Sequence, residues 1–342
     1  MPAGPSSCYS HAMPKALIHD RHGEPADVLR LADVPAELPG AGEVVLRMEA
    51  AAMHVADIRT VQGMAGFSFP LPRTPGFEGV GRVLHVGPGV DGFAVGDRAF
   101  PPSASGTFRE ELCVPAAQCM PAPEGDAAQL SLLTINGPTA WILLHGFTDL
   151  QPGDWLVQNG ANSSCGRYLV SLAREAGVRT VNVVRRMAVA DELTALGADV
   201  VLADGPGLAE RVREATGGAA PKLGVDCVAG AATQRIAECL APGSQVICYG
   251  AMSGAPCELD FYLMFRNDLV LRGISFRREL NKRTRPQVDA IYQGLAERIA
   301  DGRLQARSAA AYPLAQWREA FAQAARTGEE REGKVILVMG GD

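Results

Sequence analysis

The sequence lacks any uninterrupted apolar run of about 18 residues, so it predicts no membrane-spanning helix. It also lacks a stripe of basic side chains: 32 Lys and Arg stand against 38 Asp and Glu, a net charge of -6. Nucleic acid is therefore not expected as a partner. No segment repeats along the chain, which excludes solenoid and propeller folds.

The cysteines form no Cys-x-x-Cys pair, which argues against a disulfide framework and against a cluster of four closely spaced zinc ligands. We expect them to be reduced and mostly buried in a cytoplasmic protein. The eight residues are Cys8, Cys113, Cys119, Cys165, Cys227, Cys239, Cys248 and Cys257.

A chain of 342 residues is too long for one core and predicts two domains. Residues 1–12 are polar and have no apolar signal core, so we expect a flexible leader before a second plausible start at Met13. Residues 13–130 contain short β-rich runs between Pro/Gly turns, which is typical of a compact β-barrel. Residues 273–342 are too short for a separate domain, and we expect them to pack on this barrel.

Residues 131–272 have a different pattern, in which apolar strand-like runs alternate with helical stretches. Such alternation is typical of an α/β fold with a doubly wound parallel sheet. One strand, expected at 155–158, leads through the small residues 159–166 (NGANSSCG) into an amphipathic helix. Small residues at a helix N-terminus let backbone N–H groups approach a diphosphate, although an ordinary strand-to-helix turn is the alternative, since only Gly166 of the three-glycine pattern is a glycine.

The next expected strand, 180–184, ends in Arg185 and Arg186, where a carboxylate would favour NAD. Guanidinium groups bind a 2′-phosphate well, so the sequence favours NADPH. The alternative is that both arginines are solvated at a helix start, but cations there oppose the helix dipole, and a bound anion explains them better.

Several motifs together give the chain a resemblance to the medium-chain dehydrogenase/reductase superfamily. It is most similar to the zinc-free 2-enoyl thioester reductases, with quinone reductases as near cousins. The resemblance implies a GroES-like β-barrel catalytic domain (13–130 and 273–342) and a Rossmann nucleotide-binding domain (131–272). The motifs that carry it are ADI (56–58), PGFEGVG (75–81), GDR (96–98), NGPTA (136–140), QPGD (151–154), NVVR (182–185), DCVAG (226–230), YGAM (249–252) and GKVIL (333–337).

The resemblance also implies which residues bind the cofactor. Arg185 would hold the 2′-phosphate, and the other expected contacts are Asn136 and Thr139 near the nicotinamide, Asn162, Ser163, Ser164 and Cys165 at the diphosphate, Tyr249, Gly250 and Met252 at the ribose, and Phe276 and Lys334 at the closing cleft. In zinc-containing members, His54 and Phe77 would stand at metal-ligand positions. Because Phe cannot bind a metal ion, no zinc is expected.

Without a metal ion, hydride transfer is easiest to a conjugated acceptor, because the charge spreads onto an enolate or quinol oxygen. Enoyl reductases of this type are thought to protonate their product through a Tyr, and Ala65 stands at that position. Water or another group must then supply the proton, or the substrate is not an enoyl thioester. Our candidate is His54, with Asp57 able to orient its imidazole. The alternatives are a satisfied packing histidine and an Asp57 that caps a helix.

The leading hypothesis is an NADPH-dependent reductase of a small-molecule conjugated acceptor, which includes thioesters of coenzyme A or a carrier protein. A quinone reductase and a catalytically impaired NADPH-binding regulatory protein remain open as alternatives. Arg277, Arg278, Lys282, Arg283 and Arg285 could receive the phosphates of coenzyme A, or could be a solvated helix start. The resemblance implies a homodimer that pairs an edge strand near 269–271.

Overall fold

The computed structural model describes residues 13–64, 69–326 and 333–340. The expected leader (1–12) and Ala65 lie outside the described residues. The chain divides into two compact units. The first unit consists of residues 13–64, 69–121, 310–326 and 335–340. The second unit consists of residues 122–309, 333 and 334.

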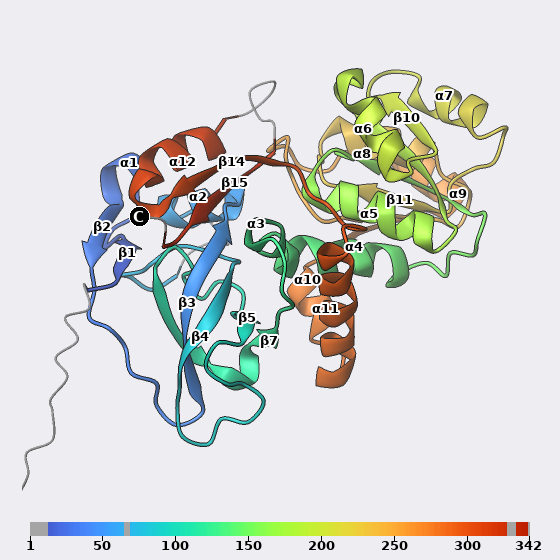
Figure 1. The fold of residues 1–342 in the computed structure, drawn as a ribbon. Helices are drawn as coiled ribbons and strands as arrows, with labels where there is room; N and C mark the ends of the chain where they lie inside the picture. The colour runs from blue at the N-terminus through green and yellow to red at the C-terminus, as the bar shows by residue number, and fades with distance from the viewer. Residues whose placement is uncertain (1–12, 65–68, 327–332, 341–342) are drawn as a thin grey trace, which may run out of the picture. The chain divides into compact units, whose positions relative to one another are not determined.

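The second unit is built around a six-stranded parallel sheet (Figure 1). Its spatial order is β10-β9-β8-β11-β12-β13. Numbered along the chain this is the 3-2-1-4-5-6 order of a Rossmann sheet, in which the strand order reverses between β8 and β11. The strands are β8 (Trp155–Asn159), β9 (Arg179–Val184), β10 (Val200–Ala203), β11 (Leu223–Asp226), β12 (Gln245–Cys248) and β13 (Val270–Gly273).

Helices cover both faces of this sheet, and β9 shows why. Val181 and Val183 pack into a cluster with side chains of α7 and α8, whereas Val184 packs with side chains of α5 and α6. Burial on both faces requires the near-continuous apolar strands seen in the sequence. The flanking helices are α5 (Ser164–Glu175), α6 (Ala190–Leu196), α7 (Leu208–Ala215), α8 (Ala231–Glu238) and α9 (Phe261–Asn267).

The other helices of this unit are α3 (Ala127–Leu130), α4 (Leu133–His145), α10 (Phe276–Leu280) and α11 (Arg285–Ala300). Residues 273–309 were expected to pack on the barrel, but the compact division places them in this unit. The buried Tyr292 of α11 donates a hydrogen bond of 2.8 Å to the carbonyl of Thr134 on α4. Leu295 and Ile299 of α11 are buried as well, so its apolar face is used within this unit.

The first unit is β-rich. A seven-stranded sheet has the order β14-β15-β3-β4-β5-β7, β6 pairs with β3, and β1 pairs with β2. Phe108, Trp317 and Phe321 pack edge to face in the core beside β3. The elements are β1 (Lys15–Ile18), α1 (Pro25–Val28), β2 (Arg30–Asp33), β3 (Glu43–Ala52), α2 (Val55–Gln62), β4 (Val80–Val86), β5 (Arg98–Phe100), β6 (Glu111–Pro115), β7 (Met120–Pro121), β14 (Ser308–Pro313), α12 (Trp317–Ala324) and β15 (Lys334–Val338). No helix of the described residues is both long and apolar enough to span a membrane.

Candidate functional site

The carboxyl ends of β8 and β11 meet at the point where the sheet order switches, the place where open α/β sheets bind ligands. Asn159 at the end of β8 donates through Nδ2 to Asp226 Oδ1 at 2.6 Å. Its Oδ1 accepts from the backbone N–H of Cys227 at 2.8 Å. These two hydrogen bonds fix the start of the predicted diphosphate turn against the end of β11.

Two glycines let the turn approach this strand and its own helix closely. Gly160 has a φ of +57°, and a Cβ there would lie 2.3 Å from the Cys227 sulfur. A Cβ on Gly166 would lie 2.6 Å from the carbonyl oxygen of Ala161. Side chains are therefore excluded at both positions, as expected of a turn that presents its backbone to a ligand.

The helix after the turn begins at a capped N-terminus. Ser163 is the N-cap of the twelve-residue helix α5, and its hydroxyl accepts from the Gly166 N–H at 3.1 Å. Ser164 and Cys165 open the helix, while Asn162 is exposed. A helix N-terminus of this kind attracts an anion through its N–H groups and dipole.

The walls of the turn carry no negative thiolate. Burial raises the pKa of Cys165 and of Cys227 to about 12, so both remain thiols at neutral pH. Lys334 lies close enough to Cys165 to act on it electrostatically. The buried Tyr249 hydroxyl lies beside both thiols without a hydrogen bond of good geometry to any described residue. An unsatisfied hydroxyl at such a site fits a polar ligand.

The predicted ribose contacts lie at the same switch point. A Cβ on Gly250 would lie 2.9 Å from the carbonyl oxygen of Cys227, so the chain after β12 packs directly on the segment that follows β11. The sulfur atoms of Met252 and Cys227 are 3.6 Å apart. The structure thus brings Tyr249, Gly250 and Met252 together with the diphosphate turn.

Arg185 and Arg186 follow β9, as predicted. The Arg185 side chain is exposed, forms no hydrogen bond or ion pair with the described residues, and lies close enough to Cys227 to act on it electrostatically. A guanidinium in this state is available to a ligand phosphate. Arg186 is half-buried and, unlike Arg185, interacts with other residues of the protein.

Asn136 and Thr139 lie one turn apart on α4 and are buried. The Asn136 amide donates to the Leu132 carbonyl at 2.9 Å, and the Thr139 hydroxyl donates to the Ile135 carbonyl at 2.6 Å. The Thr139 hydroxyl proton is thus used within the helix, which leaves its oxygen as an acceptor, and the Asn136 amide is held by the same helix. Phe276 is half-buried at the start of α10 in the same unit.

His54 lies in the other unit, at the junction of β3 and α2. Asp57 Oδ2 accepts from the backbone N–H of His54 at 2.7 Å, and the two residues form a capping arrangement at the start of α2. The imidazole Nε2 contacts the carboxylate of Glu78, which is completely buried. Asp57 therefore performs the helix-capping role, and Glu78 is the carboxylate that orients the ring.

Known proteins share the domains and the overall fold of this chain. Residues 40–124 match the alcohol dehydrogenase GroES-like domain, and residues 165–292 match the zinc-binding dehydrogenase domain. Over 302 residues the chain is 33% identical to the mitochondrial enoyl-[acyl-carrier-protein] reductase of Arabidopsis thaliana, covering 85% of this chain and 80% of that protein. This chain belongs to the medium-chain dehydrogenase/reductase superfamily.

Solved structures agree with this assignment. A mycobacterial quinone oxidoreductase superposes on the reductase with a TM-score of 0.83 and 28% identity, over 95% of this chain and 99% of that one. A mycobacterial protein complexed with NADPH gives a TM-score of 0.81 at 27% sequence identity. The match covers 95% of this chain and 99% of that chain. The predicted fold class, a GroES-like domain with a Rossmann domain, is confirmed. The chain is a medium-chain reductase related to the enoyl and quinone reductases.

The superfamily includes zinc enzymes, which raises the question of whether the donor set of this reductase fits zinc. Phe77 offers no ligand atom, and the His54 ring and the Glu78 carboxylate contact each other. Among the described residues, three potential metal ligands have their ligand atoms close together. They are Asp226, Cys248 and Cys257, and His54 is not among them. The residues at the superfamily's catalytic zinc position therefore do not fit the metal.

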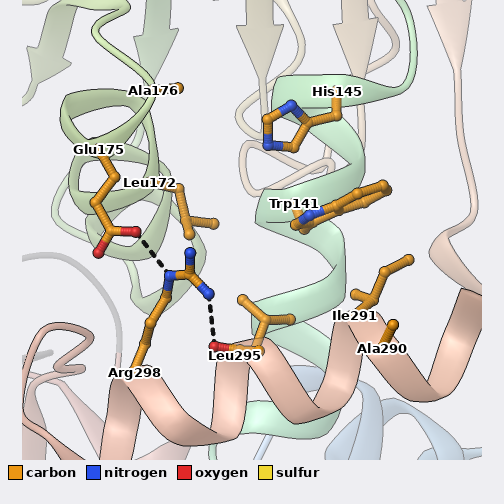
Figure 2. Close-up of a pocket in the computed structure, with 10 residues that line it drawn as sticks. Trp141, His145, Leu172, Glu175, Ala176, Ala290, Ile291, Leu295 and Arg298 are labelled. Carbon is orange, nitrogen blue, oxygen red and sulfur yellow. Dashed lines mark hydrogen bonds and ion pairs between the residues drawn. The ribbon is translucent and has the colours of Figure 1, made fainter.

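A cavity of about 250 Å³ lies elsewhere on the reductase, between α4, α5 and α11 (Figure 2). Arg298 in its wall donates to Glu175 at 2.7 Å and to the Gly294 carbonyl at 2.7 Å. Burial and the nearby Arg298 lower the pKa of His145, which keeps that ring neutral. None of the predicted site residues lines this cavity, and its charges are already paired.

The basic cluster predicted near α10 is largely used within the protein. Lys282 pairs with Glu279 at 2.7 Å, and Arg285 pairs with Asp289 at 2.6 Å. Arg283 donates to the Glu279 carbonyl at 2.6 Å and lies over the Trp141 ring. These contacts favour the solvated-helix interpretation of the cluster over a phosphate-binding one.

Sequence reasoning assigned no role to Asn159 or Asp226, and it considered Glu78 only as part of a disfavoured metal site with His54 and Asp57. Each is buried, and each holds a functional segment in place through side-chain hydrogen bonds. A signal was available for Asp226, because a single carboxylate that ends a buried apolar strand needs partners in the fold. For Glu78 the signal was its position directly after the Phe77 that replaces a ligand.

Proposed function

We propose that this reductase uses NADPH to reduce a carbon–carbon double bond conjugated to a thioester or ketone. Hydride is added to the β-carbon and a proton to the α-carbon, which yields the saturated product and NADP⁺. The observation that carries the cofactor choice is Arg185, an exposed guanidinium without a hydrogen-bond or ion-pair partner among the described residues, where a carboxylate would select NADH.

Bound NADPH would supply the hydride. The residues of this chain bind and orient the cofactor: Arg185, with Arg186 beside it, would bind the 2′-phosphate, and the N–H groups at the start of α5 would bind the diphosphate. Tyr249, with its unsatisfied hydroxyl, would bind the ribose end. The remaining proposed contacts are Asn136, Thr139, Asn162, Ser163, Ser164, Cys165, Gly166, Gly250, Met252, Phe276 and Lys334.

Similar proteins of known activity support the proposed substrate class. The Arabidopsis protein is an enoyl-[acyl-carrier-protein] reductase, and its similarity covers most of both chains. A thioester of a carrier protein or of coenzyme A is therefore the first acceptor to test. We keep His54 as the proposed proton donor. Its Nε2 contacts Glu78 and its side chain accepts from the Asp57 N–H, so the ring would have to release one of these contacts to reach the acceptor.

The second candidate function is quinone reduction, which the similarity to a mycobacterial quinone oxidoreductase favours. A quinone accepts hydride and a proton without needing a thioester site. The paired state of the basic cluster removes one of the features that would have favoured coenzyme A.

The assay that separates the functions follows NADPH oxidation with crotonyl thioester, with a simple enone and with a naphthoquinone. Turnover with the thioester or the enone supports the proposal, whereas turnover with the quinone alone supports the second candidate. Tight NADPH binding without turnover on any acceptor would indicate the catalytically impaired regulatory protein instead.

We further propose a cytoplasmic homodimer that pairs β13 with its copy. β13 is an edge strand with an exposed Val270, and the preceding helix α9 exposes Phe261, Tyr262 and Phe265. Exposed aromatic side chains beside an open strand edge are typical of a surface that is covered in the assembly. Light scattering that gives the mass of one chain would refute it.

A further inference from the structure

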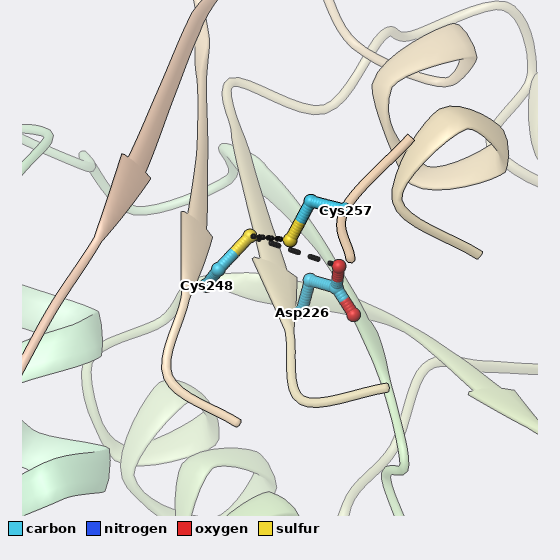
Figure 3. Close-up of side chains that lie close together, drawn as sticks. All are labelled: Asp226, Cys248 and Cys257. Atoms are coloured by element: carbon cyan, nitrogen blue, oxygen red, sulfur yellow. Dashed lines mark hydrogen bonds between the residues drawn. The ribbon is translucent and has the colours of Figure 1, made fainter. Parts of the chain in front are cut away.

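Three side chains with metal-binding atoms meet at the carboxyl ends of β11 and β12 (Figure 3). They are Asp226, which ends β11, Cys248, which ends β12, and Cys257 on the following loop. The Cys257 sulfur lies 3.7 Å from the Cys248 sulfur, which in turn lies 3.7 Å from Asp226 Oδ2. Nothing in the proposed cofactor contacts uses either thiol.

The sulfur separation matches a chelated metal ion better than a disulfide. Two thiolates at about 2.3 Å from a tetrahedral zinc ion are about 3.8 Å apart. A disulfide requires about 2.05 Å, so the sulfur atoms would have to approach by more than about 1.5 Å. The observed 3.7 Å therefore needs almost no movement to hold a tetrahedral ion.

Asp226 offers one weakly used acceptor position toward the thiols. Its Oδ1 accepts from Asn159 Nδ2 and from the backbone N–H groups of Val228 and Ala229. Its Oδ2 accepts from the Thr233 hydroxyl at 2.6 Å and otherwise only from the Cys248 thiol, which is a weak donor. Loss of the Cys248 proton would free that side of Oδ2 for a cation.

The charge of the site also suits a divalent cation. Asp226 is completely buried and forms no ion pair with the described residues. A divalent ion that displaces two thiol protons leaves the net charge of the three groups unchanged, so binding adds no buried charge to the fold. Cys257 is exposed and provides a path to solvent.

We propose that Cys248 Sγ, Cys257 Sγ and Asp226 Oδ2 bind one thiophilic divalent cation such as Zn²⁺, with water as the fourth ligand. Two S–H bonds break and two metal–sulfur bonds form, two protons pass to solvent, and no electron is transferred. The ion would fasten the loop before α9 to the ends of β11 and β12, next to Tyr249 and Met252. It would thus be a structural metal ion that stabilises this loop beside the cofactor site, and it would use none of the residues at the superfamily's zinc position near His54.

The test is titration of the metal-free, reduced full-length protein with Co²⁺, followed by thiolate-to-metal charge-transfer absorbance and visible bands of tetrahedral Co²⁺. The expected result is one ion per chain, displaced by Zn²⁺. Cys257→Ser, a change at an exposed residue, should lower the affinity at least tenfold. The matched control Cys113→Ser removes a single thiol that lies 3.6 Å from the Glu43 carboxylate, and it should leave Co²⁺ binding unchanged.

A second measurement does not depend on variants. Maleimide labelling of Cys257, read by peptide mass spectrometry, should be slowed at least tenfold by saturating Zn²⁺, while labelling of Cys113 is unaffected. The proposal would be overturned if no charge-transfer absorbance appeared or if Co²⁺ binding survived Cys257→Ser. It would also be overturned if a Cys248–Cys257 disulfide formed as fast with saturating Zn²⁺ as without it.

Discussion

At the scale of single residues, the diphosphate turn depends on the absence of side chains. Gly160 combines a left-handed backbone with a position directly over the Cys227 sulfur. The two demands are separable, because other glycines of the same unit share the backbone conformation without the contact. Gly243 has a φ of +77°, and a Cβ added there would meet no atom within 4 Å.

We predict that Gly160→Ala lowers the free energy of unfolding by about 2–4 kcal/mol, because strain in the left-handed region adds to overpacking. Gly243→Ala carries only the backbone cost and should lose about 1–2 kcal/mol. Urea denaturation of both variants measures the difference. Equal losses would show that the contact with Cys227 is unimportant, and Cys227→Ala in the Gly160→Ala background should recover part of the stability.

A second prediction concerns His19, which is completely buried in the β-rich unit. Burial lowers its pKa below the ordinary value of 6.5. Above pH 6.5 the folded and unfolded states both hold a neutral ring, so no penalty exists. As the pH falls below 6.5 the unfolded state binds the proton first, and the free energy of unfolding falls by at most about 1.4 kcal/mol per pH unit.

The measurement is urea denaturation between about pH 7.5 and about pH 5. His19→Gln should flatten the decline, whereas replacement of the exposed His85 by Gln should leave it as steep as in the unmodified protein. A decline that His19→Gln does not change would assign the acid sensitivity to other groups.

At the scale of helices and strands, α11 shows where prediction from sequence ended. Its amphipathic pattern predicted a helix correctly, but an apolar face does not identify the surface on which it packs. The hydrogen bond from Tyr292 to Thr134 spans 158 positions and gives no local signal. Residues 273–309 were therefore assigned to the wrong unit.

We predict that Tyr292→Phe lowers the free energy of unfolding by about 1 kcal/mol, because the buried carbonyl of Thr134 loses a donor. The control Gln293→Ala, at an exposed position of the same helix, should change stability by less than about 0.5 kcal/mol. Urea denaturation compares the two. The same small change in both variants would mean that the α4–α11 contact contributes little.

The strands of the parallel sheet were predicted well because burial on both faces demands continuous apolar runs, as in β8, β9 and β12. The third strand, β10, and helix α7 were not predicted. Each residue of β10 is only partly buried, since it is the sheet edge, and the strand has only four residues (Val200–Ala203) to form a pattern. The site followed the same rule, because residues in local motifs were found, whereas a long-range hydrogen-bonded pair such as Asn159–Asp226 was not.

At the scale of the whole molecule, the family and the fold are settled, and the cofactor preference and acceptor are the proposals. They depend on different parts of the protein. Arg185 and the turn after β8 belong to the parallel-sheet unit, whereas His54, Asp57 and Glu78 belong to the β-rich unit. Binding of the dinucleotide can therefore be tested without knowing the acceptor or the proton donor.

We predict that His54→Phe and Glu78→Gln lower kcat for the conjugated acceptor at least tenfold while the affinity for NADPH stays within about twofold, because the lost groups act on proton transfer. Stopped-flow kinetics and NADPH titration separate the two effects. Full kcat in both variants would mean that water alone supplies the proton and that the His54–Glu78 pair is structural.

The most direct test is calorimetric titration of the protein with NADPH and with NADH. We expect NADPH to bind about 10- to 100-fold tighter than NADH, since a charge-assisted hydrogen bond contributes about 1.5–3 kcal/mol. Arg185→Ala should abolish that preference, and Arg213→Ala, at an exposed position on α7, should retain it. Equal or tighter binding of NADH by the unmodified protein would contradict the proposed role of Arg185 in binding the 2′-phosphate.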